Sequence, residues 1–331
     1  MDKSEIEKVA VTLVTATFPT GKIGNISALA GDASTRKYYR IELQDGESVV
    51  LMEAPNEKSV ANFMEMTEIM RWLWVDAPDI YSSEGRFAIL EDLGDTLLQD
   101  YVKNAPPEKL ESEYKRAIDS LVIFQKRVRK MPNKDFACFH LKFDVEKLTF
   151  ESDFTCEHFI KGYLKRKVSA DTSKALKSEW ERINKILAEE METLAHRDLH
   201  SRNIMVKDER RVWIDYQDAR MGRGQYDLAS LLFDPYVEIP HDMVLKLADY
   251  YYTETEKAGK APWDHKTFVD IFELSGLQRA YKALGTYGYQ ATERGTDVYL
   301  PYMKPAIKTV KNIAESRQDL PALHGLLLKL F

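Results

Sequence analysis

Apolar residues recur with two different spacings along the first quarter of the chain. Near residues 4–17, and again over residues 57–75, they recur every three or four positions, which places them on one side of a helix. Between these segments, residues 25–51 alternate short β-rich runs with turn residues, and Asp45-Gly46 is a strong hairpin signal. The pattern predicts three antiparallel strands followed by one amphipathic helix.

Two more short runs of strand-forming residues, 79–83 and 86–92, follow that helix. From about Thr96 onward the pattern changes to long, charged, amphipathic helices with one exception. Residues 203–207 and 211–215 are typical of two strands joined by a polar turn centred on Glu209. We therefore expect an α+β fold in two lobes, a small sheet lobe over residues 1–94 and a mainly helical lobe over residues 95–331. The hinge is expected within residues 91–97.

Length and composition agree with a folded chain of two lobes. The 331 residues correspond to about two domains at roughly 150 residues each. Apolar residues make up 44% and charged residues 30%, which is ordinary globular usage. Because 53 acidic residues face 47 basic ones, the net charge of -6 favours neither a nucleic-acid nor a membrane partner. A basic site, if present, is expected to be local.

Export and membrane insertion are not expected either. The longest stretch without charge, residues 9–21, is shorter than the ~20 apolar residues of a membrane-spanning helix. Acidic residues outnumber basic ones ahead of it, whereas a secretory leader is positive. The two cysteines, Cys138 and Cys156, are too few for a disulfide framework. The sequence therefore predicts a cytoplasmic protein.

The most informative chemistry lies in the segment HRDLHSRNIMV, residues 196–206, and in WIDYQD, residues 213–218. An Asp, an Asn five residues later and a second Asp beyond a hairpin form a phosphoryl-transfer arrangement. If the hairpin pivots on Glu209, Asn203 and Asp215 face each other with Cβ atoms about 5 Å apart. Their oxygens can then share Mg²⁺ with substrate phosphates. Asp198, just before the hairpin, can accept the proton of an attacking hydroxyl.

Each of these residues also has a purely structural interpretation. Taken singly, Asp198 caps a loop, Asn203 forms a turn and Asp215 ends a strand. Their order, spacing and β context together favour the catalytic interpretation, with Asp198 as base and with Asn203 and Asp215 as metal ligands.

The segments HRDLHSRN, IDYQD and YDLASLL resemble the aminoglycoside phosphotransferase superfamily of small-molecule kinases with a protein-kinase-like fold. GDASTRKYYRI, LMEAP, EDLG, IDYQDA and GLQRAYKALG resemble, more particularly, the branch of anomeric kinases of N-acetylmuramate and N-acetylglucosamine in cell-wall recycling. The likeness extends over residues 24–302. It implies ATP- and Mg²⁺-dependent phosphorylation of a small sugar, and leaves the oligomeric state open.

The resemblance assigns a nucleotide site to the first lobe. It implies that the turn of Gly31, Asp32, Ala33 and Ser34 covers the nucleotide. The third strand, SVVLMEAP, lacks the Lys that usually binds the phosphates, so Arg36, and next Arg40, on the second strand are expected to replace it. The segment RFAILEDLG is expected to hold the adenine. Its contributing residues are Leu90 and Leu93 as an apolar wall, and Glu91 and Asp92 through their main chain.

The acceptor site is expected in the second lobe. The interval from Asp215 to Asp227 is only twelve residues, which leaves little room for a peptide-binding shelf and favours a small-molecule acceptor. Asp227 is expected to be a helix N-cap, and the resemblance implies that it braces the catalytic loop. The candidate substrate-binding residues are His200, Arg202, Asp218 and Arg279.

Two alternatives stay open at the level of sequence. The acceptor can be another small hydroxyl compound, such as an aminoglycoside, an amino alcohol or an amino acid, although the basic residues of HSRN, QDARMGR and LQRAYK suit an acidic or neutral sugar better. The missing third-strand Lys also fits a nucleotide-binding pseudokinase module. A binding-only protein, however, has no need of the base Asp198.

Overall fold

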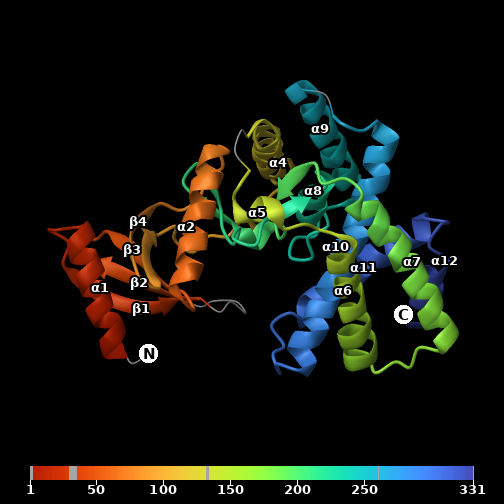
Figure 1. Cartoon of the computed structure of the whole chain (residues 1–331), viewed down its shortest axis with the longest axis horizontal. Helices are drawn as coiled ribbons and strands as arrows, with labels where there is room; N and C mark the ends of the chain where they lie inside the picture. The colour runs from red at the N-terminus through yellow and green to blue at the C-terminus, as the bar shows by residue number, and fades with distance from the viewer. Residues whose placement is uncertain (1–2, 30–35, 132–133, 260, 331) are drawn as a thin grey trace. The chain divides into compact units, whose positions relative to one another are not determined.

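A computed structural model describes the chain except for residues 1–2, 30–35, 132–133, 260 and 331. The chain forms two compact units (Figure 1). Unit 1 contains Met1–Thr96 and Ile204–Gln217, and unit 2 contains Leu97–Asn203 and Asp218–Phe331. The first passage between the units therefore falls within the segment expected to be the hinge.

Unit 1 is built on a five-stranded antiparallel sheet of order β1-β2-β3-β5-β4. Its strands are β1 (Ile23–Leu29), β2 (Lys37–Leu43), β3 (Ser48–Glu53), β4 (Ile80–Glu84) and β5 (Phe87–Glu91). The three predicted antiparallel strands and the two further strands are confirmed.

Helices α1 (Lys3–Thr17) and α2 (Glu57–Trp72) complete the main body of unit 1, as predicted. One side of α1, including Leu13 and Val14, joins Ile41 and Leu51 of the sheet in a buried core. The Asn56 side chain caps α2 by accepting a hydrogen bond of 3.0 Å from the Ser59 N–H. The apolar periodicity of these segments is thus explained by burial on one face.

A hairpin of β7 (Ile204–Lys207) and β8 (Arg210–Trp213) also belongs to unit 1. Ile204 pairs with Trp213 and Lys207 with Arg210, so the turn contains two residues. The predicted pivot on Glu209 is therefore wrong, and continuing this register sets Asn203 opposite Ile214 rather than Asp215. The physical reason is Asp208, whose left-handed φ of 52° closes the shorter turn.

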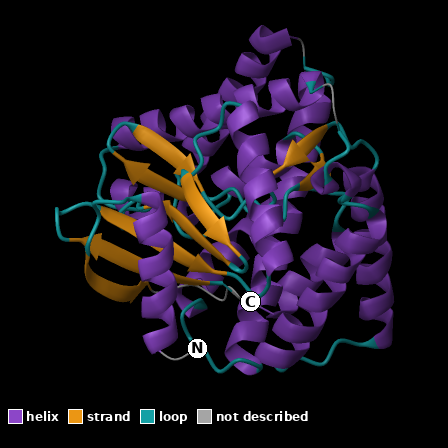
Figure 2. Cartoon of the chain, turned by 60° about the vertical axis from the view of Figure 1, so that its left-hand side comes forward, coloured by secondary structure: helices purple, strands orange, loops and turns teal. Residues whose placement is uncertain are grey.

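Unit 2 is mainly helical, as predicted (Figure 2). Its helices are α3 (Leu98–Val102), α4 (Pro107–Lys130), α5 (Ala137–His140), α6 (Val145–Thr155), the π-helix η1 (Cys156–Tyr163), α7 (Ala170–Ala188), the 3-10 turn η2 (Ser201–Asn203), α8 (Gln225–Leu232), α9 (His241–Gly259), α10 (His265–Thr292), α11 (Leu300–Ser316) and α12 (Pro321–Leu330). A short antiparallel pair, β6 (Thr193–Ala195) and β9 (Arg220–Gly222), was not predicted, because three residues are too few for an alternating pattern.

Helix α10 organises the core of unit 2. It packs against α6, η1, α8 and α11. Its buried residues Leu277, Tyr281 and Leu284 join Trp180 of α7 in the main core. Side chains that project from the ends and flanks of this core are therefore held in fixed positions.

Within the described residues, none of the helices combines the length and the apolar character needed to cross a membrane.

Candidate active site

The loop that precedes η2 in unit 2 is fixed from behind by a buried carboxylate. Asp227 accepts hydrogen bonds from the His196 N–H at 2.6 Å and from the Arg197 N–H at 3.1 Å. The bracing role is confirmed. The N-cap prediction is wrong, because α8 begins at Gln225 after Gly224, which puts Asp227 inside the first turn.

Further contacts hold the same loop. Arg197 has a left-handed φ of 86°, a conformation that costs energy for a residue with a side chain. The Asn203 amide nitrogen donates to the Asp198 carbonyl oxygen at 2.8 Å, and the Ser201 N–H donates to the Asp234 carboxylate at 2.8 Å. The loop is thus held in one conformation by bonds at several points.

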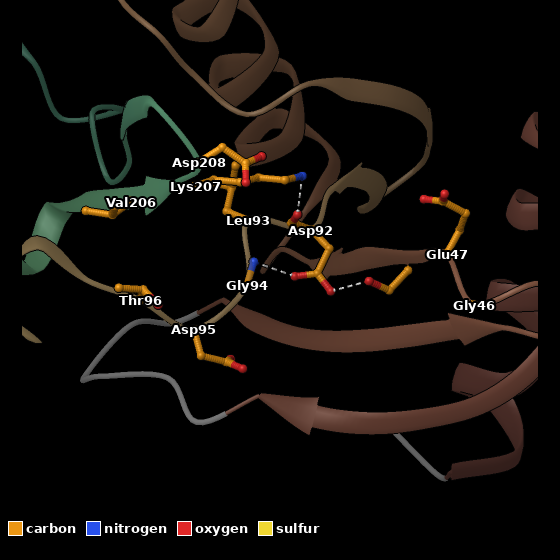
Figure 3. Close-up of a pocket in the computed structure, with 11 residues that line it drawn as sticks. Gly46, Glu47, Asp92, Leu93, Gly94, Asp95, Thr96, Val206, Lys207 and Asp208 are labelled. Carbon is orange, nitrogen blue, oxygen red and sulfur yellow. Dashed lines mark hydrogen bonds between the residues drawn. The ribbon is translucent and has the colours of Figure 1, made fainter. Parts of the chain in front are cut away.

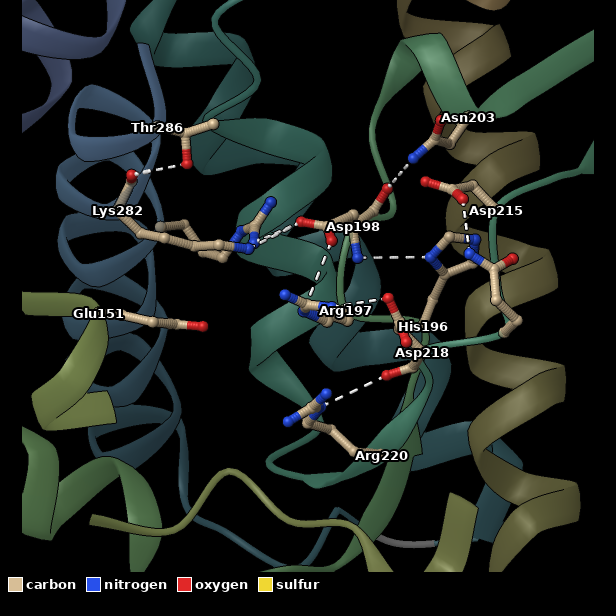
Figure 4. A network of polar contacts seen from close by, with 12 residues as sticks. Glu151, His196, Arg197, Asp198, Asn203, Asp215, Asp218, Arg220, Lys282 and Thr286 are labelled. Carbon is tan, nitrogen blue, oxygen red and sulfur yellow. Dashed lines mark hydrogen bonds and ion pairs between the residues drawn. The ribbon is translucent and has the colours of Figure 1, made fainter. Parts of the chain in front are cut away.

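Three cations surround the Asp198 carboxylate in unit 2 (Figure 4). Its Oδ1 accepts hydrogen bonds from Arg279 Nη1 at 2.9 Å and from Lys282 Nζ at 3.0 Å. Its Oδ2 lies 3.6 Å from Arg197 Nε. Although burial raises the pKa of Asp198, these charges outweigh it and hold the pKa well below its usual range. Asp198 is therefore an oriented carboxylate and a weak base.

Lys282 is a site residue that the sequence reasoning missed. Arg279 and Lys282 lie three residues apart on α10, a spacing that puts both on one helix face within GLQRAYKALG. The Lys282 side chain is only 16% exposed, and burial lowers its pKa to about 8. The i, i+3 pair of cations in an apolar helix was the available signal.

Arg197 links Asp218 to the same cluster. Its Nη1 donates to Asp218 Oδ2 at 3.0 Å, and Arg220 Nε donates to the Asp218 carbonyl oxygen at 3.3 Å (Figure 4). The predicted substrate residues Asp218 and Arg279 are thus connected to Asp198, Arg279 directly and Asp218 through Arg197.

His200 and Arg202 pack on aromatic rings. The His200 ring meets Tyr236 edge-on at 5.1 Å, and the Arg202 guanidinium lies 4.8 Å from the Tyr236 ring centroid. Burial lowers the pKa of His200 to about 3, so its imidazole is neutral near pH 7. Their role in substrate binding stays a prediction.

Asp215 follows β8 in unit 1 and has a left-handed φ of 64°. Its Oδ1 accepts a hydrogen bond from Gln217 Nε2 at 2.8 Å. Burial raises the pKa of the Tyr38 phenol. The charge of Asp215 raises this pKa further, whereas the charge of Arg36 and its hydrogen bond to the phenol lower it. Arg36 and Asp215 therefore lie near the same phenol.

The other candidate cation of unit 1, Arg40, is bound to carboxylates. It donates to both oxygens of Asp92, at 2.7 and 3.0 Å, and to both oxygens of Asp95, at 3.0 and 2.9 Å. Ser48 donates to the same Asp92 at 2.7 Å. These bonds commit the Arg40 guanidinium to two carboxylates.

The expected hinge residues lie beside a polar cavity of about 400 Å³, which Figure 3 shows. Asp92 and Leu93 line it, and Lys207 donates to the Asp92 carbonyl oxygen at 2.8 Å. Glu91 is buried and pairs with Lys207 at 3.0 Å and Arg210 at 2.6 Å, which ties the hairpin to β5. The Glu91 and Asp92 side chains thus have structural partners of their own.

Leu90 of β5 and Leu93 of the hinge segment are buried. The predicted nucleotide-covering residues Gly31, Asp32, Ala33 and Ser34 lie outside the described residues.

The donor atoms of Asn203 and Asp215 suit magnesium chemically. Because the Asn203 amide nitrogen is committed to Asp198, the amide oxygen is the atom left for a cation. Among the residues that the structure describes, no group of three or more His, Cys, Asp and Glu side chains could hold a metal. Mg²⁺ usually binds through one or two protein groups together with waters and substrate phosphates.

Known proteins are similar to this chain over most of its length. The family model described as "Phosphotransferase enzyme family" matches residues 25–262. An N-acetylmuramate/N-acetylglucosamine kinase of Neisseria meningitidis serogroup B is 28% identical over 92% of this chain and 90% of its own. A protein of the same name from Pseudomonas aeruginosa is 26% identical over 91% and 87%.

Solved structures show the same fold. ADP-bound aminoglycoside phosphotransferase APH(2'')-Ib is 15% identical with a TM-score of 0.61, covering 98% of this chain and 99% of its own. Choline kinase from Cryptosporidium parvum is 12% identical with a TM-score of 0.64, covering 97% and 99%. The predicted α+β kinase-like fold is confirmed. Since the family model spans more than half of the chain, the protein belongs to the phosphotransferase enzyme family and is a small-molecule kinase.

Proposed function

We propose that this protein is an ATP- and Mg²⁺-dependent kinase that phosphorylates the anomeric hydroxyl of N-acetylmuramate, N-acetylglucosamine or both. The names of its relatives support the acceptor. The observation that carries the proposal is the Asp198 carboxylate, which Arg279, Lys282 and Arg197 keep ionised on a rigid loop. The proposed substrates, ATP and an amino sugar recovered from the cell wall, fit an enzyme of the cytoplasm.

Asp198 aligns and deprotonates the acceptor. One oxygen, Oδ1, is occupied by two cations, so Oδ2 is the atom that can receive a hydrogen bond from the sugar hydroxyl. As the hydroxyl oxygen bonds to the γ-phosphorus, the bond from that phosphorus to the leaving ADP oxygen breaks and the proton passes to Asp198. Because this transition state is loose, a weak but well-placed base is sufficient.

The nucleotide is assigned to residues of unit 1. Arg36 binds the phosphates in place of the Lys that β3 lacks, and Arg40 is paired with two carboxylates. Leu90 and Leu93 form the apolar wall of the adenine site. Asn203 and Asp215 hold Mg²⁺, which when bound neutralises phosphate charge.

The charge around Asp198 favours a neutral or acidic acceptor. Arg197, Arg279 and Lys282 contact the carboxylate, and Arg220 lies beside Arg197. A polycationic aminoglycoside or a quaternary amino alcohol would be repelled here. These acceptors, and a nucleotide-binding module without catalysis, are the competing functions.

The decisive experiment incubates the protein with ATP, Mg²⁺ and each acceptor, and detects phosphorylated product by mass spectrometry. We expect a sugar phosphate from one or both N-acetylated sugars, and we expect Asp198→Asn to lower kcat by roughly a thousandfold or more. The control Asp171→Asn, an exposed acid of α7, should retain full activity. ATP binding without product from any acceptor would instead support the binding module.

A further inference from the structure

Glu151 of α6 is a buried carboxylate, and one of its oxygens lacks a hydrogen bond within the part of the chain that the structure describes. The residue is 5% exposed, and its Oε2 accepts a hydrogen bond of 2.7 Å from Gln278 Nε2 of α10. Its Oε1 has no hydrogen-bond partner among the described residues, and Lys147 Nζ lies 3.5 Å away. A buried carboxylate oxygen usually has a hydrogen-bond donor, which an ordered water or a hydroxyl of a bound ligand can supply.

The Glu151 side chain points toward the Asp198 cluster. Figure 4 shows it projecting from α6 toward Arg197 and Lys282, the two cations on either side of Asp198. Its charge interacts with both of them and with Arg220. All of these residues belong to unit 2. Glu151 therefore lies close to the cations that contact the catalytic carboxylate.

Aromatic rings continue this face beyond Glu151. Phe154 and His158, one and two turns further along α6 and η1, lie 4.2 Å apart between ring centroids, and His158 meets Tyr289 of α10 edge-on at 5.0 Å. A carboxylate beside partly exposed rings offers a hydrogen-bond acceptor for hydroxyls and apolar surface for the C–H faces of a sugar.

We infer that Glu151 Oε1 accepts a hydrogen bond from a ring hydroxyl of the acceptor and thereby sets which sugars are phosphorylated. The inference rests on the proposed function and deepens it. A carboxylate would repel the phosphates of ATP and the acid group of N-acetylmuramate, so this atom requires an uncharged donor, and the ring hydroxyls of the sugar can provide one. Because the bonded hydroxyl is not the reacting one, the interaction contributes equally to ground and transition states, and its loss raises KM.

The first test is Glu151→Gln assayed with N-acetylglucosamine, since this change removes the charge and keeps the shape. We expect the KM for the sugar to rise ~10- to 100-fold, as for a hydrogen bond to a charged group. The kcat and the KM for ATP should stay within about threefold. The control Glu157→Gln, an exposed acid on η1, should leave all constants unchanged. An unchanged sugar KM in Glu151→Gln overturns the inference.

The second test identifies the hydroxyl with analogues of N-acetylglucosamine that lack the hydroxyl at carbon 3, 4 or 6. For one analogue, the wild type should lose about as much kcat/KM as the Glu151→Gln variant loses with the full sugar. The Glu151→Gln variant assayed with that same analogue should then show little further loss of kcat/KM. If the loss of kcat/KM caused by the substitution multiplies with the loss caused by the missing hydroxyl for every analogue, the inference is overturned. If Glu151→Gln fails to fold, Glu151→Asp, which keeps the charge but withdraws it by one methylene, replaces it with the same expectations.

The outcomes separate this inference from the proposed function. A wild type that phosphorylates neither N-acetylated sugar contradicts the proposed function, and the inference falls with it. A wild type that does so, together with a Glu151→Gln variant that behaves like Glu157→Gln, contradicts only the role of Glu151.

Discussion

At the scale of single residues, two clusters of ion pairs, one around Asp198 and one around Arg40, set how these side chains can act. Asp198 has two cations on one oxygen and a third near the other, so its charge is fixed and its direction is set. Arg40 shows the opposite arrangement, in which two carboxylates occupy one guanidinium. These two clusters give separate predictions for catalysis and for nucleotide binding.

Lys282 positions Asp198, and Lys282→Met should therefore impair the chemical step. Arg279 stays on Oδ1, so the carboxylate keeps one of its two orienting bonds. We expect kcat to fall about tenfold or more, with the KM for ATP nearly unchanged. Stability should change little, because the lost ion pair is offset by removing a buried ammonium whose pKa burial lowers to about 8. Lys266→Met, at an exposed position of α10, is the control, and an unchanged kcat in Lys282→Met would exclude the positioning role.

Arg36 and Arg40 should respond differently to replacement by Gln. Arg36→Gln is expected to raise the KM for ATP by about tenfold, because a phosphate-binding cation is lost. Arg40→Gln is expected to lower the melting temperature instead, since it leaves the buried Asp92 without its guanidinium partner. Steady-state kinetics and thermal unfolding of both variants provide the check. The reverse pattern would assign the phosphates to Arg40.

At the scale of elements, the site of unit 2 depends on close packing between α10 and η1. Gly288 lies directly against the His158 carbonyl, where an added Cβ would come within 2.6 Å of the oxygen. Gly285 allows the same close approach to Thr155. These two glycines of α10 thus allow the close packing that brings Glu151 of α6 and Lys282 of α10 to the same side of unit 2.

Gly288→Ala should disrupt this packing. The contacts are to backbone atoms, which cannot move aside as a flexible side chain can. We expect the free energy of unfolding to fall by about 1 to 3 kcal/mol and the KM for the acceptor to rise as η1 and α10 separate. Urea denaturation measures the first effect. Gly325→Ala in α12, where an added Cβ meets nothing within 4 Å, should be neutral or slightly stabilising, and equal losses in both variants would contradict the explanation.

At the scale of the whole molecule, a buried acid couples global stability to pH. Asp234 accepts hydrogen bonds from the Ser201 N–H at 2.8 Å and from the Tyr236 N–H at 2.7 Å. Burial nevertheless raises the pKa of Asp234 to about 6, from 3.8. The folded state therefore binds this proton more tightly than the unfolded state does. The resulting stabilisation is complete below about pH 3.8 and is lost as the pH rises through about 6.

Asp234→Asn should remove this dependence on pH. Between pH 7 and pH 5 the wild type is expected to gain about 1 kcal/mol of unfolding free energy relative to the variant, since one pKa unit corresponds to about 1.4 kcal/mol. Urea midpoints of both proteins at the two pH values measure this difference in unfolding free energy. The contributions of other titrating groups are the same in both proteins and cancel. A variant that gains as much as the wild type on acidification would contradict the assignment to Asp234.

Local sequence was sufficient for the features that depend on neighbours along the chain. Apolar spacing predicted the strands of unit 1 and helices α1 and α2, because burial on one face imposes that spacing. The order of Asp198, Asn203 and Asp215 pointed to phosphoryl transfer, because a loop followed by a hairpin is one continuous segment. The likeness to the family followed from the same short motifs.

The tertiary structure decided everything that depends on segments far apart in sequence. One local feature was also decided only by the structure. The register of the β7–β8 turn followed from the left-handed backbone of Asp208, and an apolar pattern does not report a single φ angle. Lys282 reaches Asp198 from 84 residues away, and Glu151 reaches the same face from a third segment. Sequence spacing fixes which helix face a residue occupies. Only the packing of one helix against another determines which charges then meet.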